Sequence, residues 1–343
     1  MRGTRRKPWQ AGLLSFFVLG LGQVYNGQAR RGLLFFCLYI LVGFSCVVIM
    51  LELSLAPWNI AFPASILLAG YALILIDAVK TAHRQGETFQ RKFYNRWYIY
   101  LALILLSAFV IQPTCVLTLR HIWLQAFIIP SGAMESTLLV GDRILVNKLR
   151  YRLSSPRHFD VIVFRYPWEE GRVFIKRVIA LPGERVQVRD RQVYVNERPL
   201  QEPYAQYMVP RGREEPFGPV LVPKRGDTIE IRSDQQLYVN GEPVPIPPGP
   251  YYPRDHGAAM TGFAVFYGPL FPAGATLQKP IGPLVVQDDY YFTLGDNRDN
   301  SKDSRYWGFV PRANVLGTAK RLYWSWDRAD RRVRWERIGQ DIR

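Results

Sequence analysis

Long apolar runs dominate the first third of the chain. Three of them are long enough for a helix to cross a bilayer, which takes about 20 apolar residues. These runs are residues 32–51, 53–76 and 97–119. The pattern therefore predicts two transmembrane helices, at about 32–52 and 55–76, within an N-terminal membrane region of residues 1–96, and a third transmembrane helix at 97–119.

A shorter apolar stretch precedes these runs. It begins at Ala11, contains three glycines by Gly22 and is too short to span a bilayer. It follows a basic start, as the core of a signal peptide would, but Gly20-Leu21-Gly22-Gln23 is a poor cleavage site and the spans follow at once. Because both its flanks are basic, we predict that residues 11–24 form a re-entrant or interfacial segment.

Beyond residue 120 the pattern changes to short alternating runs separated by Pro and Gly turns, which is typical of β-strands. Two segments echo each other, residues 186–199 and 229–243, and each reads as two strands around a tight polar turn. Residues 244–283, rich in Gly, Pro and aromatic residues, predict an extended excursion of poor regularity. The expected fold is an all-β domain over 120–343, mostly antiparallel, attached to an α-helical membrane region.

Charge predicts the orientation of the spans. The chain carries 44 Lys and Arg against 28 Asp and Glu, a net charge of +16, and residues 1–96 hold eleven of the basic and three of the acidic residues. The basic residues precede the first run and fill the loop 77–96, whereas residues 52–59 have none. Since cytoplasmic loops collect Lys and Arg, we expect the N-terminus and the 77–96 loop to be cytoplasmic and residues 120–343 to be extracytoplasmic.

The remaining positive charge indicates lipid rather than nucleic acid. It is spread over a β region in which 33 basic residues are mixed with 25 acidic ones. Residues 321–343 suit the anionic headgroups of a membrane. We therefore expect membrane lipid as a partner and no nucleic acid, while the oligomeric state stays unknown.

Cysteine and histidine give no metal site. Cys37, Cys46 and Cys115 all lie in the apolar runs, so the β region has neither a disulfide nor a thiolate ligand. The four histidines show no ligand spacing. We expect no metal and no cofactor. A Ser/His/Asp triad would have to use His158 near Asp160, which reads instead as a turn histidine.

Three segments hold the residues that could do chemistry. They are residues 127–142 (FIIPSGAMESTLLVGD), 173–183 (VFIKRVIALPG) and 294–311 (LGDNRDNSKDSRYWGFVP). Together they resemble the sequence boxes of bacterial type I signal peptidase (leader peptidase), a membrane-bound protease with a Ser/Lys dyad. The resemblance covers roughly residues 105–335. It implies a peptidase domain on the periplasmic side of the bacterial inner membrane that cleaves signal peptides from exported preproteins after small residues at −1 and −3.

Lys176 matches the general base of this family. A free lysine has a pKa of about 10.4, and burial lowers the pKa by several units. Strand alternation places Phe174, Lys176 and Val178 on one face, so the lysine has apolar neighbours. The strand alone favours a lysine reaching into water, and the resemblance reverses that interpretation. Arg177, on the other face, is expected to be a structural or ion-pair residue.

The nucleophile position departs from the family. The pattern Ser-Gly-Ser-Met maps onto Ser131, Gly132, Ala133 and Met134, so alanine stands where the nucleophilic serine is expected and no acyl-enzyme can form there. The Ala133 N–H and the Ser131 hydroxyl would still make an oxyanion hole. Three explanations stay open: a deliberate substitution in a protease, a natural relative that binds signal peptides without cleaving them, and attack by Ser131 in a shifted register.

The other polar residues of these boxes are expected to support the site. The resemblance implies that Ser301 hydrogen-bonds and orients the lysine amine. It also implies that Asp303 and Arg305 form a structural ion pair, and that the turn Gly295, Asp296 and Asn297 brings this loop beside the lysine. Ser136 and Thr137 lie too far along to replace the nucleophile, and we expect their hydroxyls to bond the backbone of their own loop.

Overall fold

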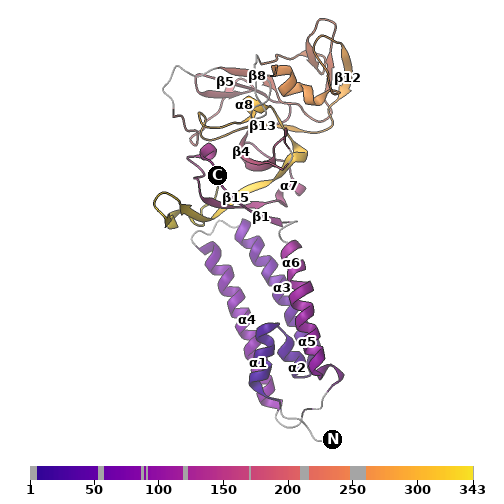
Figure 1. Ribbon diagram of the computed structural model, residues 1–343, viewed down its shortest axis with the longest axis vertical. Coiled ribbons are helices and arrows are strands. Elements are labelled where there is room, and N and C mark those ends of the chain that lie inside the picture. The colour runs from indigo at the N-terminus through magenta and orange to yellow at the C-terminus, as the bar shows by residue number, and fades with distance from the viewer. Residues whose placement is uncertain are drawn as a thin grey trace. The chain divides into compact units, whose positions relative to one another are not determined.

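The computed structural model describes residues 6–52, 58–85, 89, 92–118, 123–169, 171–208, 216–247 and 260–342. The chain divides into two compact units, Met1–Trp123 and Leu124–Arg343. The first is helical and the second is built from antiparallel strands, which confirms the predicted fold class (Figure 1). Residues 53–57 and 119–122, a predicted loop and the predicted end of the third span, lie outside the described residues, as does part of the 244–283 segment.

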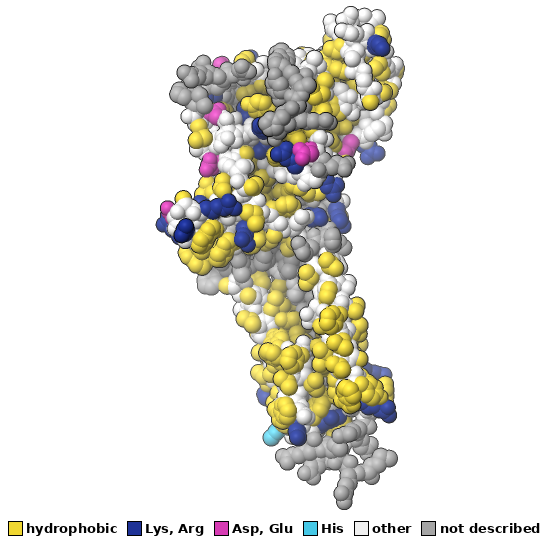
Figure 2. Space-filling model, viewed as in Figure 1, with side chains coloured by type: hydrophobic (Ala, Val, Ile, Leu, Met, Phe, Trp, Pro, Cys, Tyr) yellow, Lys and Arg dark blue, Asp and Glu magenta, His cyan; other side chains and the backbone are white. Residues whose placement is uncertain are grey.

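Among the described residues of the first unit, three stretches are long and apolar enough to cross a membrane: Ala29–Cys46, Ala61–Gln85 and Trp97–Thr118. Their side chains are mostly exposed, and Figure 2 shows a largely hydrophobic surface over these helices. The helices are α3 (Ala29–Glu52), α4 (Trp58–Gln85), and the consecutive α5 (Trp97–Leu106), π-helix η2 (Ser107–Ile111) and α6 (Gln112–Thr118). The second helix thus continues beyond the predicted end at residue 76.

The predicted short segment forms two helices, α1 (Pro8–Phe17) and α2 (Leu21–Tyr25), which pack against α3 and α4. Gly20 and Gly32 let the backbones approach, since a β-carbon on Gly20, whose φ is +86°, would lie 2.2 Å from the Gly32 carbonyl oxygen. The buried Gln23 donates to the Ile74 carbonyl and to Asp77 on α4. The segment is therefore anchored to the candidate spans, and its place in a bilayer stays a prediction.

An eight-stranded sheet forms the base of the second unit, counted over the described residues. Its order is β1-β2-β15-β3-β4-β13-β14, with β16 paired to β15. The bounds are β1 Leu124–Ile128, β2 Asp142–Asn147, β3 Val161–Arg165, β4 Val173–Ala180, β13 Tyr290–Leu294, β14 Val310–Pro311, β15 Val315–Asp327 and β16 Arg332–Val333, with the short helices α7 Arg150–Leu153 and α8 Ser304–Trp307. The long β15 lies between β2 and β3 and joins the two halves of the sheet.

The two echoing segments fold alike. Strands β5 (Arg185–Arg189), β6 (Gln192–Val195) and β7 (Arg198–Pro199) pair with β8 (Phe217–Leu221), whereas β9 (Thr228–Ile231), β10 (Leu237–Val239) and β11 (Glu242–Pro243) pair with β12 (Ile281–Val285). Asn196 and Asn240 take equivalent places, since both have positive φ and each accepts the backbone N–H of its first strand, from Arg185 and Thr228. The predicted hairpins are thus two copies of one local structure.

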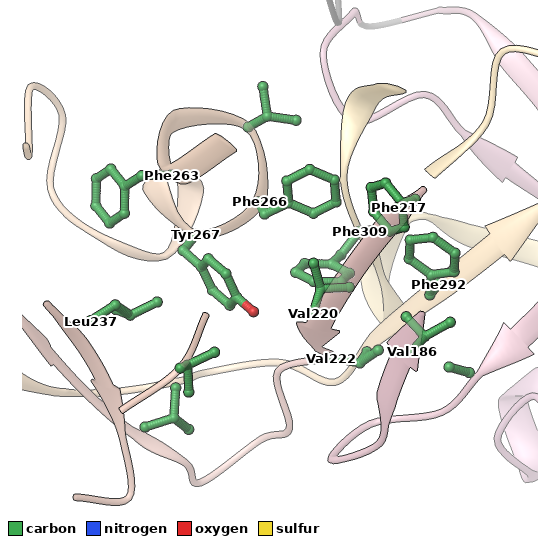
Figure 3. Close-up of a cluster of buried hydrophobic side chains, with 14 of the residues drawn as sticks. Val186, Phe217, Val220, Val222, Leu237, Phe263, Phe266, Tyr267, Phe292 and Phe309 are labelled. Atoms are coloured by element: carbon green, nitrogen blue, oxygen red, sulfur yellow. The ribbon is translucent and has the colours of Figure 1, made fainter. Parts of the chain in front are cut away.

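The structure describes part of the predicted excursion at 244–283. Residues Phe263–Tyr267 form a short π-helix, η5, and Ile281–Val285 is strand β12. Figure 3 shows the ring of Phe266 among Phe217, Phe292 and Phe309, with ring centroids 5.4–5.6 Å apart for Phe266–Phe217 and Phe266–Phe309. The aromatic residues that suggested an irregular loop are buried because they fill the space between the sheets.

Candidate functional site

Lys176 lies in β4 with an apolar surrounding. Its side chain is 2% exposed, its cross-strand neighbour is Ile162, and its amine lies 5.8 Å from the ring centroid of Phe174. Phe174 and Val178 pack in the same hydrophobic cluster, as the alternation predicted. Burial lowers the pKa of Lys176 from 10.5 to about 8, although the charges of Asp303 and Asp296 oppose the drop. The amine is therefore neutral in a large fraction of molecules slightly above neutral pH.

Ala133 lies in the turn between β1 and β2. Residues Gly132–Met134 form a 3₁₀ turn, η4, which begins directly after the extended residue Ser131. Met134 is buried and anchors this turn in a core cluster with Ile129 and Leu138. Ser131 is exposed, and its side chain makes no cap hydrogen bond to the turn. The buried Met134 thus holds the turn in place, while the side chain of Ser131 stays exposed.

Gly295 brings the predicted residues together. It follows β13, in which Leu294 pairs with Arg177, and extending this register by one residue places Gly295 beside Lys176. A β-carbon on Gly295 would lie 2.1 Å from the Ser301 hydroxyl oxygen and 2.5 Å from the Ala133 carbonyl oxygen. Lys176, Ser301 and Ala133, taken from three separate sequence boxes, therefore surround one glycine that has no room for a side chain.

A buried ion pair connects the three boxes. Arg177 donates to both carboxylate oxygens of Asp296, at 2.8 and 2.6 Å, and both side chains are 1% exposed. Thr137 donates to the same carboxylate and accepts from Arg177. Asn297 donates to the Gly132 and Ala133 carbonyls, at 3.2 and 3.3 Å. The loop with Ala133 is thereby fixed to β4 and to the turn after β13.

Asp303 and Arg305 pair beside this turn. Arg305 donates to Asp303 at 2.8 and 2.9 Å, and Asp303 accepts the Gly295 N–H at 3.1 Å. Burial raises the pKa of the Asp303 carboxyl, but the charge of Arg305 and its hydrogen bonds outweigh burial and hold that pKa below its usual range. Asp303 therefore stays ionised and fixes the backbone of Gly295.

Two expected hydrogen-bond arrangements differ in the structure. The Ser301 hydroxyl is buried and has no hydrogen-bond partner among the described residues, so it does not bond the Lys176 amine. The hydroxyl lies instead against Gly295. Ser136 and Thr137 do not bond the backbone of their own loop: Ser136 donates to the Tyr204 carbonyl at 2.5 Å, and Thr137 donates to Asp296.

The segment 200–208 belongs to the site although it carries no motif. Gln206 pairs with Asn297 in a parallel bridge, and its N–H donates to the Asp296 carbonyl at 2.7 Å. The ring of Tyr204 lies 3.9 Å from the guanidinium carbon of Arg177. Since this pairing joins residues about ninety positions apart, no local pattern could have indicated it.

The geometry does not support a Ser/His/Asp triad that uses His158 and Asp160. His158 contacts the Ile179 carbonyl and Glu184, whereas Asp160 accepts from Tyr151 and the Arg157 N–H, so the two do not form a triad. The described residues contain no cluster of three or more His, Cys, Asp or Glu side chains that could hold a metal ion.

Comparison with known proteins agrees with this arrangement. The profile described as "Signal peptidase, peptidase S26" matches residues 98–219 and 220–324, which is more than half of the chain. The chain belongs to the signal peptidase family. Signal peptidase I of Aquifex aeolicus is 36% identical over 227 residues, covering 61% of this chain and 79% of the relative. Signal peptidase I of Pseudomonas aeruginosa is 31% identical over 241 residues, covering 62% and 68%.

The signal peptidase match starts at residue 98, so α1 to α4 lie before it. A solved signal peptidase I from Enterococcus faecalis is 28% identical and covers 48% of this chain and 97% of its own, with a TM-score of 0.24. That score is too low to support the fold, which rests on the strand pairing described above. Membership of the signal peptidase family thus concerns the β domain and the helix α5 that leads into it.

Proposed function

We propose that the β domain is the peptidase domain of a signal peptidase I in which Ala133 stands at the nucleophile position and Lys176 is the general base. The observation that carries this proposal is the buried Lys176, whose pKa falls to about 8, beside the glycine that contacts the Ala133 carbonyl. A lysine amine acts as a base only when it is neutral, and burial is what makes it so.

The proposed reaction needs a serine at position 133. Neutral Lys176 would take the proton of that hydroxyl while its oxygen attacks the scissile carbonyl, and the backbone N–H of residue 133 with the Ser131 hydroxyl would hold the oxyanion. The lysine would then activate the water that releases the acyl group. Ala133 has no hydroxyl, so we infer that the chain binds signal peptides and does not cleave them by this route.

The proposed place of reaction is the outer face of a bacterial inner membrane. The candidate span Trp97–Thr118 ends directly before the peptidase domain, and basic residues precede it in the loop 77–96. Because such loops face the cytoplasm, the peptidase domain would follow on the other side, where preproteins emerge. Extended substrate would add as a strand beside the Ser131 segment, with small side chains at −1 and −3.

Cleavage of a preprotein by the full chain, with and without Ala133→Ser, tests this proposal. We expect Ala133→Ser to raise the rate by roughly 10³-fold or more over the parent, since removal of a catalytic nucleophile costs at least that much. Lys176→Met in the Ala133→Ser chain serves as the matched control and should abolish the gain. A folded Ala133→Ser chain that binds the preprotein without cutting it would contradict the proposal and favour a silent signal-peptide binder.

The exposed Ser131 gives a second candidate nucleophile. Its hydroxyl lies two residues before Ala133 and makes no cap hydrogen bond to the turn. Cleavage by the chain as it stands, lost in Ser131→Ala, would identify Ser131 as the nucleophile. Under the proposal above the parent chain and Ser131→Ala are both inactive.

A further inference from the structure

The helical unit contains a positively charged cavity that the peptidase function does not use. Its volume is about 860 Å³, and it lies between the N-terminal segment and the start of α5. Four of its lining side chains are basic, Arg6, Lys7, Lys92 and Arg96, and none of the lining residues that the structure describes is acidic. The four basic residues precede the part of the chain that matches the signal peptidase family.

Arg6 is the most unusual residue of this cavity. Its side chain is 6% exposed, and its guanidinium carbon lies 4.2 Å from the ring centroid of Tyr25 and 3.8 Å from that of Phe89. Its Nε and Nη2 atoms have no hydrogen-bond partner among the described residues. Donors of a charged group are costly to bury without an acceptor, so these two atoms favour a negatively charged ligand in the cavity.

The walls of the cavity are held in place by hydrogen bonds. The Lys92 amine donates to the Gly27 carbonyl at 2.9 Å, and Asn95 donates to the Val24 carbonyl at 2.8 Å. The Tyr25 hydroxyl accepts the Lys7 N–H at 3.2 Å and donates to the side chain of Gln10. Two segments distant in sequence, residues 6–7 and 92–96, therefore present their cations on walls that hydrogen bonds to residues 24–27 hold together.

The start of α5 adds to the positive potential of the cavity. It also indicates at which level of a bilayer the cavity would lie. Arg96 is the N-cap residue and its side chain makes no cap hydrogen bond, and the positive end of the helix dipole adds to the charge of the cavity. Trp97 and Tyr98 also line the cavity, are exposed, and begin the candidate span Trp97–Thr118. Tryptophan and tyrosine at the end of a span mark the level of lipid headgroups.

We propose that this cavity binds the phosphate group of an anionic phospholipid headgroup. Phosphate offers several acceptor oxygens to a fork of arginine donors and to neighbouring lysines. Figure 2 shows Lys and Arg side chains gathered at the end of the helices where the N-terminus lies, which is where an anionic leaflet would meet them. A free phosphate ester has the same acceptor chemistry, and the experiment separates these two sources.

Lipid binding to the full chain in detergent micelles tests the proposal. Native mass spectrometry would count phosphatidylglycerol bound per chain as the lipid is titrated, with phosphatidylcholine as the lipid without net charge. We expect one phosphatidylglycerol to bind about tenfold or more tightly than phosphatidylcholine. Arg6→Ala should weaken that binding by about tenfold, in line with the loss of a charged hydrogen-bond donor.

Two further variants keep the test decisive. Lys7 is exposed, so Lys7→Ala should fold normally and should still weaken phosphatidylglycerol binding by at least about threefold. Arg84→Ala removes an exposed cation from the end of α4, outside the lining, and should change binding by less than about twofold. Parent-like binding in both Arg6→Ala and Lys7→Ala, or equal binding of the two lipids, would overturn the proposal.

Glycerol 1-phosphate gives the second arm of the experiment. If the cavity takes the headgroup of a lipid, glycerol 1-phosphate at equal concentration should leave phosphatidylglycerol bound, because it lacks the acyl chains that hold the lipid beside α5. Displacement at equal concentration would overturn the lipid source and assign the cavity to a soluble phosphate ester.

Discussion

A lysine can act as a base only in the fraction of molecules in which its amine is neutral, and Lys176 meets this condition because its surroundings penalise the charged form. Burial by Ile162 and Phe174 lowers its pKa to about 8, while the carboxylates of Asp303 and Asp296 keep it from falling further. Asp303 forms an ion pair with Arg305, and Asp296 forms one with Arg177. The two arginines partly cancel the effect of these carboxylates on the pKa of the lysine.

The rate of peptide cleavage by the Ala133→Ser chain should therefore depend on pH in one direction. Below pH 8 the amine is mostly protonated, so kcat/KM should rise about tenfold per pH unit, and above pH 8 it should level off. A pH–rate profile from 6 to 10 on a peptide without titratable groups measures this. A profile that is flat between pH 6 and 8, or falls there, would show that Lys176 is not the base.

At the scale of elements, one carboxylate joins the loop after β1 to β4 and to the turn after β13. Asp296 binds Arg177 through two hydrogen bonds and accepts a third from Thr137. Asp296→Asn leaves Arg177 as an uncompensated buried charge, so we expect the free energy of unfolding of the β domain to fall by about 3–5 kcal/mol. Denaturant unfolding followed by near-UV circular dichroism measures the loss.

An exposed ion pair of the same domain provides the matched control. Arg172 and Glu169 pair at 3.0 Å, with side chains 45% and 55% exposed. Glu169→Gln should change the free energy of unfolding by less than about 1 kcal/mol. If Asp296→Asn were as mild as this control, the ion pair would not be what holds the site together.

The sequence predicted the elements of the site better than the contacts between them. The three boxes and the strand face of Lys176 follow from local pattern and family resemblance. The roles of Thr137, Tyr204 and Gln206 do not, because they depend on pairing between segments far apart in the chain. The burial of the aromatic residues of 263–267 could not be predicted for a related reason, because they belong to a short π-helix that packs against residues from distant strands.

At the scale of the whole molecule, the chain divides into two compact units. Residues 124–343 have their own sheets and core clusters, and the site is built from this unit alone. We expect residues 124–343 with Ala133→Ser to fold without the helices and to cleave a short soluble peptide at a rate within about tenfold of the full chain, since no group of the site is removed.

The same fragment should lose more activity on a preprotein inserted in vesicles, because it lacks the spans that hold the full chain in the same membrane. Side-by-side assays of both substrates measure the difference. Equal loss on both substrates would mean that the helices contribute to the site itself.

The position of β15 in the sheet determines when, during synthesis, the two halves of the sheet can pair with it. The loop with Ala133 belongs to the β1–β2 half, Lys176 belongs to the β3–β4 half, and β15 is the strand between them. β15 cannot pair with both halves until the ribosome has passed residue 327, roughly 10 to 40 seconds after Asp142 at usual rates of synthesis. A nascent chain therefore carries Lys176 and the loop with Ala133 without the strand that pairs their two halves until synthesis of the domain is nearly over.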